Sequence, residues 1–179
     1  MYHTNINNSD NEIFQKFTES VSYDRNLFRQ DIKGSLAHAK MLAKQNIIST
    51  DDAKKICSGL SQIEKEIIDN KFIWKYELED IHMNIESRLQ ELIGDIAGKL
   101  HTARSRNDQI ALDMRLFLKE TIVDTIKLLL ELQSTIIARA EENLDVIIPG
   151  YTHMQRAQPL LLSHHLIAYF NMFTRDITR

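Results

Sequence analysis

The sequence predicts an all-α protein, in which a small N-terminal helical domain precedes long helices of a central helical bundle shared in an oligomer. Residues 107–148 contain no Gly or Pro and are rich in Leu, Ile, Ala, Glu and Lys, which favours one long helix. The chain of 179 residues has only five Gly and two Pro, and 43% of it is hydrophobic. This length and composition predict one sizeable core or two small ones.

The predicted long helix has a broader apolar surface than one small domain could cover, and it is longer than such a domain. Apolar residues recur at helical spacing through residues 107–148 and cover more than one stripe. Such a helix would span about 60 Å, whereas a compact globule of this chain's length is roughly 40 Å across. A bundle shared between subunits explains both features. The predicted domains are therefore residues 1–105, which are helical, and residues 106–179, which start the bundle.

Three helices are predicted in the N-terminal domain, after an Asn-rich and partly ordered arm that ends near Thr18. The first begins near Asp24. The second follows Ser49 to Asp52, whose hydroxyls and carboxylates suit the N-terminus of a helix. The third opens at Glu79-Asp80. Between the last two, residues 72–76 are short and aromatic and predict an extended connector with at most minor strand.

Glycines mark the end of this domain and the end of the long helix. Gly94 and Gly98 weaken the end of the third helix, so the boundary to the long helix lies around Leu100 to Arg106. Pro149-Gly150 predicts a turn after the long helix. Residues 160–178 are apolar enough to form another bundle helix that returns beside the first.

Charge and composition restrict the class of partner and the compartment. Lys and Arg number 22 against 25 Asp and Glu, and the net charge of −3 argues against a nucleic-acid partner or an anionic membrane surface. The polar N-terminus lacks the apolar core of a signal peptide, and no charge-free apolar stretch is long enough to span a membrane. The single Cys57 cannot form an internal disulfide. We expect a soluble, cytoplasmic protein.

A basic segment precedes the long helix and is a candidate anion site. Lys99, Arg104 and Arg106 lie just before a helix start, where unpaired amide hydrogens and the positive end of the helix dipole favour an anion. Alternatively, Asn107 and Asp108 are simple helix caps and the arginines are solvated.

Two further patterns carry polar chemistry. Thr152 and His153 place a hydroxyl and an imidazole after Pro149-Gly150, where His can exchange protons near neutral pH, although a lone His in a turn is more often structural. Glu79, His82 and Glu86 would share one helix side, either as a metal half-site or as a hydrogen-bonded ladder. The ladder is favoured because no second His cluster has ligand spacing.

Taken together, these segments resemble the argininosuccinate lyases of the fumarase and aspartase superfamily. The resemblance rests on the order and spacing of three segments around the long helix: Glu79-Asp80-Ile81-His82, His101-Thr102-Ala103-Arg104-Ser105-Arg106-Asn107-Asp108-Gln109 and Gly150-Tyr151-Thr152-His153-Met154-Gln155-Arg156-Ala157-Gln158-Pro159. Ser20 and Tyr23-Asp24-Arg25 extend it, and it covers the chain from about Phe14.

The resemblance also has two departures. The Gly- and Arg-containing segment usual near the family's N-terminus is replaced by the Asn-rich arm. The chain stops at Arg179, before the family's Gly-Ser-Ser-rich loop with its catalytic serine. It therefore resembles the N-terminal part of a longer enzyme, and we expect it to be inactive alone.

The resemblance implies a function: reversible elimination of argininosuccinate to arginine and fumarate, without metal or organic cofactor, by a homotetramer whose active sites each draw on three subunits. It implies that Ser20, Asn107 and Thr152 bind polar groups of the substrate and that Arg106 adds positive charge. His82 and His153 would line the site, with His153 assisting proton transfer. Two other classes remain open: a catalytically silent relative such as the lens δ-crystallins, and a helical oligomerisation module.

Overall fold

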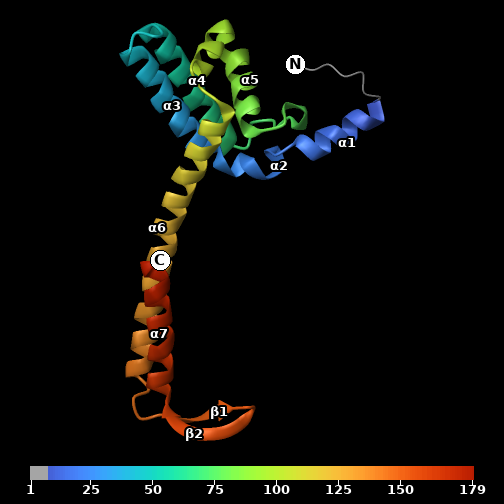
Figure 1. The fold of residues 1–179 in the computed structure, drawn as a ribbon. Helices are drawn as coiled ribbons and strands as arrows, with labels where there is room; N and C mark the ends of the chain where they lie inside the picture. Colours follow the sequence, from blue (N-terminus) through green and yellow to red (C-terminus); the bar gives the residue numbers. More distant parts are fainter. Residues whose placement is uncertain (1–7) are drawn as a thin grey trace. The chain divides into compact units, whose positions relative to one another are not determined.

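The computed structural model describes residues 8–179 and divides the chain into two compact units, Met1–Phe117 (the first unit) and Leu118–Arg179 (the second unit). Helices dominate, and the strands of the described residues form one two-stranded antiparallel sheet (Figure 1), which confirms the predicted fold class. The elements in chain order are α1 (Asn8–Thr18), α2 (Val21–Asp24), η1 (Arg25–Leu27), α3 (Phe28–Lys44), α4 (Thr50–Ile68), η2 (Tyr76–Leu78), α5 (Ile81–Ile93), η3 (Gly94–His101), α6 (Arg106–Glu141), β1 (Ile147–Thr152), β2 (Gln155–Leu161) and α7 (Leu162–Thr178).

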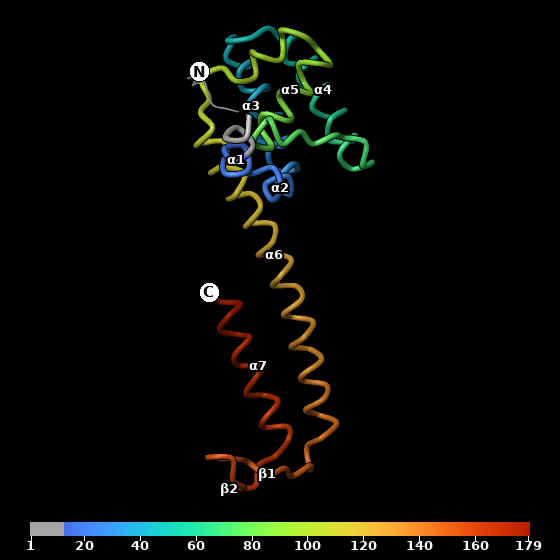
Figure 2. The backbone as a smooth tube through the Cα atoms, turned by 90° about the vertical axis from the view of Figure 1, so that its right-hand side faces the viewer, coloured from blue at the N-terminus to red at the C-terminus, as the bar shows by residue number. Residues whose placement is uncertain are grey.

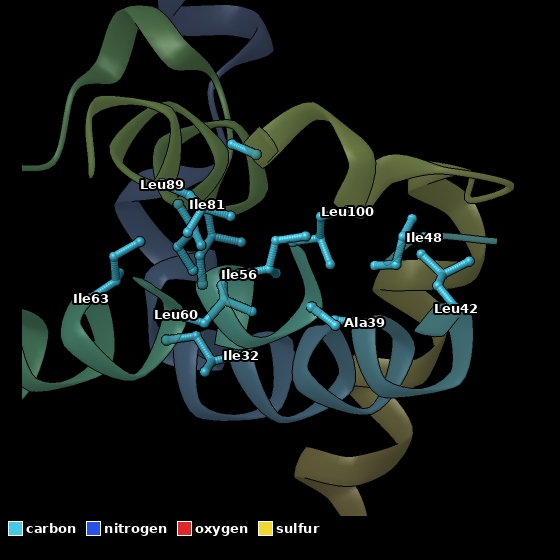
Figure 3. Packing of buried hydrophobic residues seen from close by; sticks show 13 residues of the cluster. Ile32, Ala39, Leu42, Ile48, Ile56, Leu60, Ile63, Ile81, Leu89 and Leu100 are labelled. Atoms are coloured by element: carbon cyan, nitrogen blue, oxygen red, sulfur yellow. The ribbon is translucent and has the colours of Figure 1, made fainter. Parts of the chain in front are cut away.

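The core of the first unit lies between α3, α4 and α5 (Figure 3). Ile56, Leu60 and Ile63 recur at helical spacing along α4 and are fully buried. At Gly59, on the same helix, an added Cβ would lie 2.5 Å from Leu89 Cδ1, so the missing side chain allows α4 and α5 to pack closely. This packing fixes α5, which carries His82, against the rest of the unit.

Side-chain caps set the starts of two helices as predicted. Ser49 Oγ accepts a hydrogen bond of 3.0 Å from the amide of Asp52 at the start of α4. Asp80 Oδ1 accepts one of 2.7 Å from the amide of Met83 at the start of α5. Glu79 precedes this cap with a φ of 60°, so it does not share a helix face with His82, and the predicted ladder is wrong in that member.

The predicted arm differs from the structure, whereas the predicted connector agrees with it. The described part of the arm is helical in α1, and residues 1–7 lie outside the described residues. Residues 72–75 form no regular element, and a 3-10 turn, η2, follows them. Phe72 and Trp74 instead pack ring to ring, with centroids 4.5 Å apart. The aromatic residues in this connector are explained by their packing against the core, and no strand is needed to account for them.

The long helix α6 has 36 residues, about 54 Å at the usual rise per residue. It ends at Glu141, earlier than predicted, because Asn143 Nδ2 donates a 2.8 Å hydrogen bond to the carbonyl of Arg139 and closes the last turn. The predicted domain boundary between residues 105 and 106 falls at the start of α6, whereas contacts divide the chain within it. No helix among residues 8–179 is long and apolar enough to cross a membrane.

In the second unit, α7 runs beside the later part of α6 in both views (Figure 2). Gln133 Nε2 donates hydrogen bonds to the carbonyl of Phe170 at 2.9 Å and to Thr174 Oγ1 at 2.7 Å. These contacts confirm the predicted returning helix. Both helices nevertheless leave large apolar side chains exposed, namely Leu118, Ile122, Val123, Leu128, Leu130, Leu132, Ile137, Ile167, Tyr169 and Met172.

The chain turns after Pro149-Gly150, as predicted, but these two residues belong to strand β1 and not to the turn itself. The chain reverses at His153 and Met154, whose φ angles are 51° and 60°. Pro149 pairs with Pro159 across the ribbon, and the register shifts between Pro149 and Tyr151. Each strand of a two-stranded ribbon is an edge strand, which is where a sheet tolerates proline, and β-branched Ile147 and Ile148 favour the extended form.

We expect Ile63→Ala to destabilise the first unit by about 2–5 kcal/mol, since Ile63 is completely buried and its removal leaves a cavity. Ile68→Ala, on the same helix but at a side chain that is 49% exposed, is the matched control and should cost under about 1 kcal/mol. Urea unfolding followed by circular dichroism measures both. Equal losses for the two variants would contradict the assigned core.

Candidate active site

A buried polar network joins α3, α5 and α6 in the first unit. His82 Nδ1 lies 2.9 Å from Asp31 Oδ1, and Gln109 Nε2 donates to the same oxygen at 2.6 Å. All three side chains are almost completely buried. Gly34 makes the approach of α3 to α6 possible, because an added Cβ would lie 2.9 Å from Leu112 Cδ2. The network therefore depends on close packing of three helices.

Asp113 completes the network without a hydrogen bond of its own. Its Oδ2 lies 3.9 Å from His82 Nδ1, and neither carboxylate oxygen has a hydrogen-bond partner among the described residues. Asp113 is fully buried. Burial, followed by the negative charge of Asp31, raises the pKa of Asp113 to about 7. The side chain can therefore hold a proton at neutral pH.

The pKa values of the other two groups move in opposite directions. Burial acts to raise the pKa of Asp31, but the hydrogen bond and charge of His82, together with Gln109, lower it below its usual range. Burial acts to lower the pKa of His82, but the hydrogen bond and charge of Asp31 outweigh burial and raise it. Asp31 and His82 thus form an ion pair. Of the two carboxyls in the network, Asp113 binds a proton more readily than Asp31.

The side chains of Asp31, His82 and Asp113 are close enough together to be considered as ligands of a metal ion. The donor atoms of Asp31, His82 and Asp113 lie within 4.8 Å of one another. The hydrogen bonds within the cluster already use His82 Nδ1 and Asp31 Oδ1. We therefore assign Asp31 and His82 to hydrogen bonding, and we assign no metal to the cluster.

Ser20 lies against the N-terminus of α5. Its Oγ donates a 2.6 Å hydrogen bond to Asp24 Oδ2, which also accepts the amide of Ile81 at 3.3 Å. The amides of Ser20 and Val21 donate to the carbonyl of Glu79 at 2.8 and 3.0 Å. These bonds connect α2 to the start of α5, so Ser20 lies beside the beginning of the helix that carries His82.

Arg106 is held by carboxylates at the start of α6. Its Nη1 donates to Glu86 Oε1 at 3.1 Å and to Gln109 Oε1 at 3.0 Å, and its Nε lies 3.4 Å from Asp80 Oδ2. Gln109 thereby contacts both Arg106 and Asp31. The guanidinium is half-buried, so the arginine is not simply solvated, and its charge is fixed beside the His82 network.

Of the two residues considered as caps of α6, Asp108 takes part in the cap through its side chain and Asn107 does not. Ser105 Oγ accepts from the amide of Asn107 at 3.3 Å, and Asp108 Oδ1 accepts from the amide of Ser105 at 2.8 Å. The Asn107 side chain is exposed in the first turn. Arg104 Nη1 donates to Ser35 Oγ at 2.8 Å and faces α3. Arg106 and Asn107 are therefore the side chains best placed to meet an anion here.

The remaining predicted residues belong to the second unit. Thr152 is the last residue of β1, and His153 lies in the hairpin turn; both side chains are exposed. Thr152 also lines a hollow in the hairpin together with Tyr151 and His165. The first unit thus brings together Ser20, His82, Arg106 and Asn107, and the second unit carries Thr152 and His153.

Sequence reasoning missed Asp31, Gln109 and Asp113. One signal was present: Gln109 and Asp113 lie four residues apart in an apolar run, which places two polar side chains on one face of a helix. A polar pair at that spacing in a helix destined for the core indicates a buried network. Asp31 has no comparable signal, since it lies among other polar residues.

Comparison with known proteins decides the family. The model of a family described as Lyase matches residues 5–179, nearly the whole chain. The chain belongs to this lyase family. The chain is 54% identical over 171 residues to the argininosuccinate lyase of Sulfurihydrogenibium sp. (strain YO3AOP1), and the match covers 96% of this chain and 37% of the relative. It is 53% identical over 162 residues to that of Geobacter metallireducens (strain ATCC 53774 / DSM 7210 / GS-15), with 90% and 35% covered.

Solved structures agree with this lyase assignment. EDDS lyase in complex with formate matches with a TM-score of 0.73 and 29% identity, over 85% of this chain and 29% of that one. The β-carboxy-cis,cis-muconate cycloisomerase of Acinetobacter calcoaceticus sp. ADP1 matches with a TM-score of 0.70 and 16% identity, over 93% and 41%, which shows the shared fold. The resemblance to the argininosuccinate lyases is confirmed, and the chain spans just over a third of the length of the curated relatives named above.

The raised pKa of Asp113 predicts a specific dependence of stability on pH. A carboxyl that binds its proton more tightly in the folded state loses its contribution to stability as pH rises from about 4 to 7. Asp113→Asn removes this loss, so the variant should gain about 1–3 kcal/mol relative to the parent between pH 5 and pH 8. Urea unfolding at the two pH values measures the change.

The control is Asp124→Asn, at an exposed carboxyl on the same helix, which should leave the pH dependence as it is in the parent. If the free energies of unfolding of Asp113→Asn and of the parent changed equally between the two pH values, Asp113 would be ionised in the folded protein throughout this range.

Proposed function

We propose that this chain supplies part of the active site of an argininosuccinate lyase, which reversibly splits argininosuccinate into arginine and fumarate. The observation that carries the proposal is identity of 54% and 53% to two argininosuccinate lyases over at least 90% of the chain. The grouping of Ser20, His82, Arg106 and Asn107 in the first unit supports it, because the reaction requires polar groups around a carboxylate.

The elimination removes a proton from the carbon beside a substrate carboxylate and breaks the bond to the guanidinium nitrogen. The electrons of the broken C–H bond form the double bond of fumarate, and the C–N electrons leave with the nitrogen, which takes up a proton. Negative charge builds on the carboxylate in the transition state, so fixed cations and donors aimed at it lower the barrier. Arg106 supplies such a charge, and the first turn of α6 supplies amide hydrogens.

The other predicted residues complete the assignment of roles. Ser20 and Asn107 would bind polar groups of the substrate on the first unit's side, and His82 would line that side. Thr152 would bind the substrate from the hairpin, and His153 would assist proton transfer. The Thr152 hydroxyl and the His153 imidazole are neighbours in the chain, and both are exposed and so accessible to a substrate.

The assembly proposed for this enzyme is a cytoplasmic homotetramer, without a nucleic-acid or membrane partner and without metal or organic cofactor. Apolar side chains exposed on both helices, such as Leu128 on α6 and Ile167 on α7, support self-association because water would otherwise solvate a long apolar surface. A domain division at residues 105 and 106 fits this assembly, since α6 would then belong entirely to the shared bundle.

Turnover tests the proposal. The completed enzyme is defined as this chain joined to the part of the Sulfurihydrogenibium relative that its match leaves uncovered. We expect the completed enzyme to release fumarate from argininosuccinate, followed by ultraviolet absorbance, and the 179-residue chain alone to release none. The reason is that the family's serine-containing loop is not in these residues, and removal of one member of a cooperative site costs orders of magnitude.

Two outcomes would contradict the proposal. A completed enzyme that folds and assembles but produces no fumarate would favour a silent scaffold of the δ-crystallin kind. Fumarate from the 179-residue chain alone would show that the chemistry does not depend on the absent loop.

A further inference from the structure

We propose that Asp31 is a positioning residue: its buried carboxylate holds His82 through Nδ1 and thereby presents Nε2 of the imidazole to the substrate. The inference rests on the proposed function insofar as His82 lines the substrate site. It adds a residue that lies 51 positions earlier in the chain, on a different helix, and outside all the segments that carry the family resemblance.

The geometry fixes which imidazole nitrogen carries a proton. Asp31 Oδ1 lies 2.9 Å from His82 Nδ1, and an ionised carboxylate can only accept a hydrogen bond. Nδ1 must therefore be the donor. Of the two ring nitrogens, Nε2 is left to meet a ligand, and it accepts a hydrogen bond when the ring is neutral and donates one when the ring is charged.

Asp31 is itself held in place. Gln109 Nε2 donates to the same Oδ1 at 2.6 Å, and the Asp31 side chain is 1% exposed. Gln109 also accepts a hydrogen bond from Arg106 through its Oε1 at 3.0 Å. The anchor of the His82 ring is thus connected through one amide to the arginine that we place against the substrate carboxylate.

The charges around His82 favour its protonated form. Asp31, Asp24, Asp80 and Asp113 are the acidic groups that face it, and Arg106 is the opposing cation. A charged ring would present an N–H donor at Nε2, which suits a carboxylate whose negative charge grows in the transition state. Without Asp31, burial would favour the neutral ring and either tautomer.

Asp113 supplies a matched control for Asp31. Both carboxyls are almost completely buried, both neighbour His82, and Asp→Asn changes both in the same way. Only Asp31 is hydrogen-bonded to the ring, whereas Asp113 Oδ2 lies 3.9 Å from His82 Nδ1. A purely structural role would make the two variants alike in the state of the imidazole.

The first readout is the nitrogen NMR spectrum of the 179-residue chain labelled at histidine, with the His82 signal identified by its absence in His82→Gln. We expect protonation at Nδ1 in the parent and in Asp113→Asn. Asp31→Asn should lose the single tautomer and titrate at lower pH. A parent signal from the Nε2-protonated tautomer would overturn the proposal without any Asp31 variant, so the test survives poor folding of Asp31→Asn.

The second readout is kinetic, in the completed enzyme. Asp31→Asn should lower kcat/KM on the order of 10²-fold or more, with a shifted pH profile, whereas Asp113→Asn should remain within about tenfold of the parent. An active parent whose Asp31→Asn variant keeps both the kcat/KM and the pH profile of Asp113→Asn would overturn the positioning role. An inactive parent would instead reject the proposed function, and the NMR result would still decide the tautomer of His82.

Discussion

His153→Asn in the completed enzyme is expected to lower kcat/KM by about 10²–10⁴-fold, because a proton-transferring imidazole contributes about that much to catalysis. The fold should survive the change, since His153 is exposed in a turn and packs against no core. Thr152→Ala should also lower kcat/KM strongly, because the substrate loses its contact with the Thr152 hydroxyl. Steady-state fumarate release measures the loss, and circular dichroism monitors the fold.

The matched control makes the same chemical change at another exposed histidine of the second unit. His164→Asn, on α7, should retain kcat/KM within a few-fold of the parent. A loss at His164 as large as that at His153 would show that the effect comes from assembly of the bundle and not from proton transfer in the turn.

Arg106→Gln is expected to produce the second large effect, a decrease in kcat/KM on the order of 10²–10³-fold, typical of the loss of one stabilising group in the transition state. The variant also leaves Glu86 and Asp80 without their arginine partner. Because these side chains are partly exposed, the loss of stability should stay below about 1 kcal/mol. Kinetics and urea unfolding of the same preparation separate the two effects.

Arg115→Gln is the matched control for the arginine. Arg115 is exposed on α6 and donates only to the carbonyl of Ala111 in its own helix among its described contacts. Its replacement should leave kcat/KM near that of the parent. Arg106→Gln with parental kcat/KM would remove Arg106 from the proposed substrate site.

Helices α3, α4 and α5 of the first unit were predictable because their signals are local. Apolar spacing along α4 and the caps at Ser49 and Asp80 depend on residues within one or two turns. The hairpin was not predictable from the same kind of signal. Its β1 strand is defined by pairing with residues 155–161, and a Pro-Gly pair read locally predicts a turn instead.

The candidate site divides in the same way. Ser20, His82, Arg106 and Asn107 could be chosen from motifs because they recur in a recognisable order around a long helix. The buried carboxyl Asp31 could not, because its role arises only when α3, α5 and α6 pack together and its sequence neighbours are themselves polar.

A mixing experiment is the most direct test of an active site that contains both Arg106 and His153. Completed enzymes that carry Arg106→Gln or His153→Asn are each expected to be nearly inactive. If an assembled site takes Arg106 from one subunit and His153 from another, dissociating and reassociating the two variants together will restore fumarate release well above that of either alone. Activity that stays at the level of the single variants, although mixed oligomers form, would contradict a site shared between subunits.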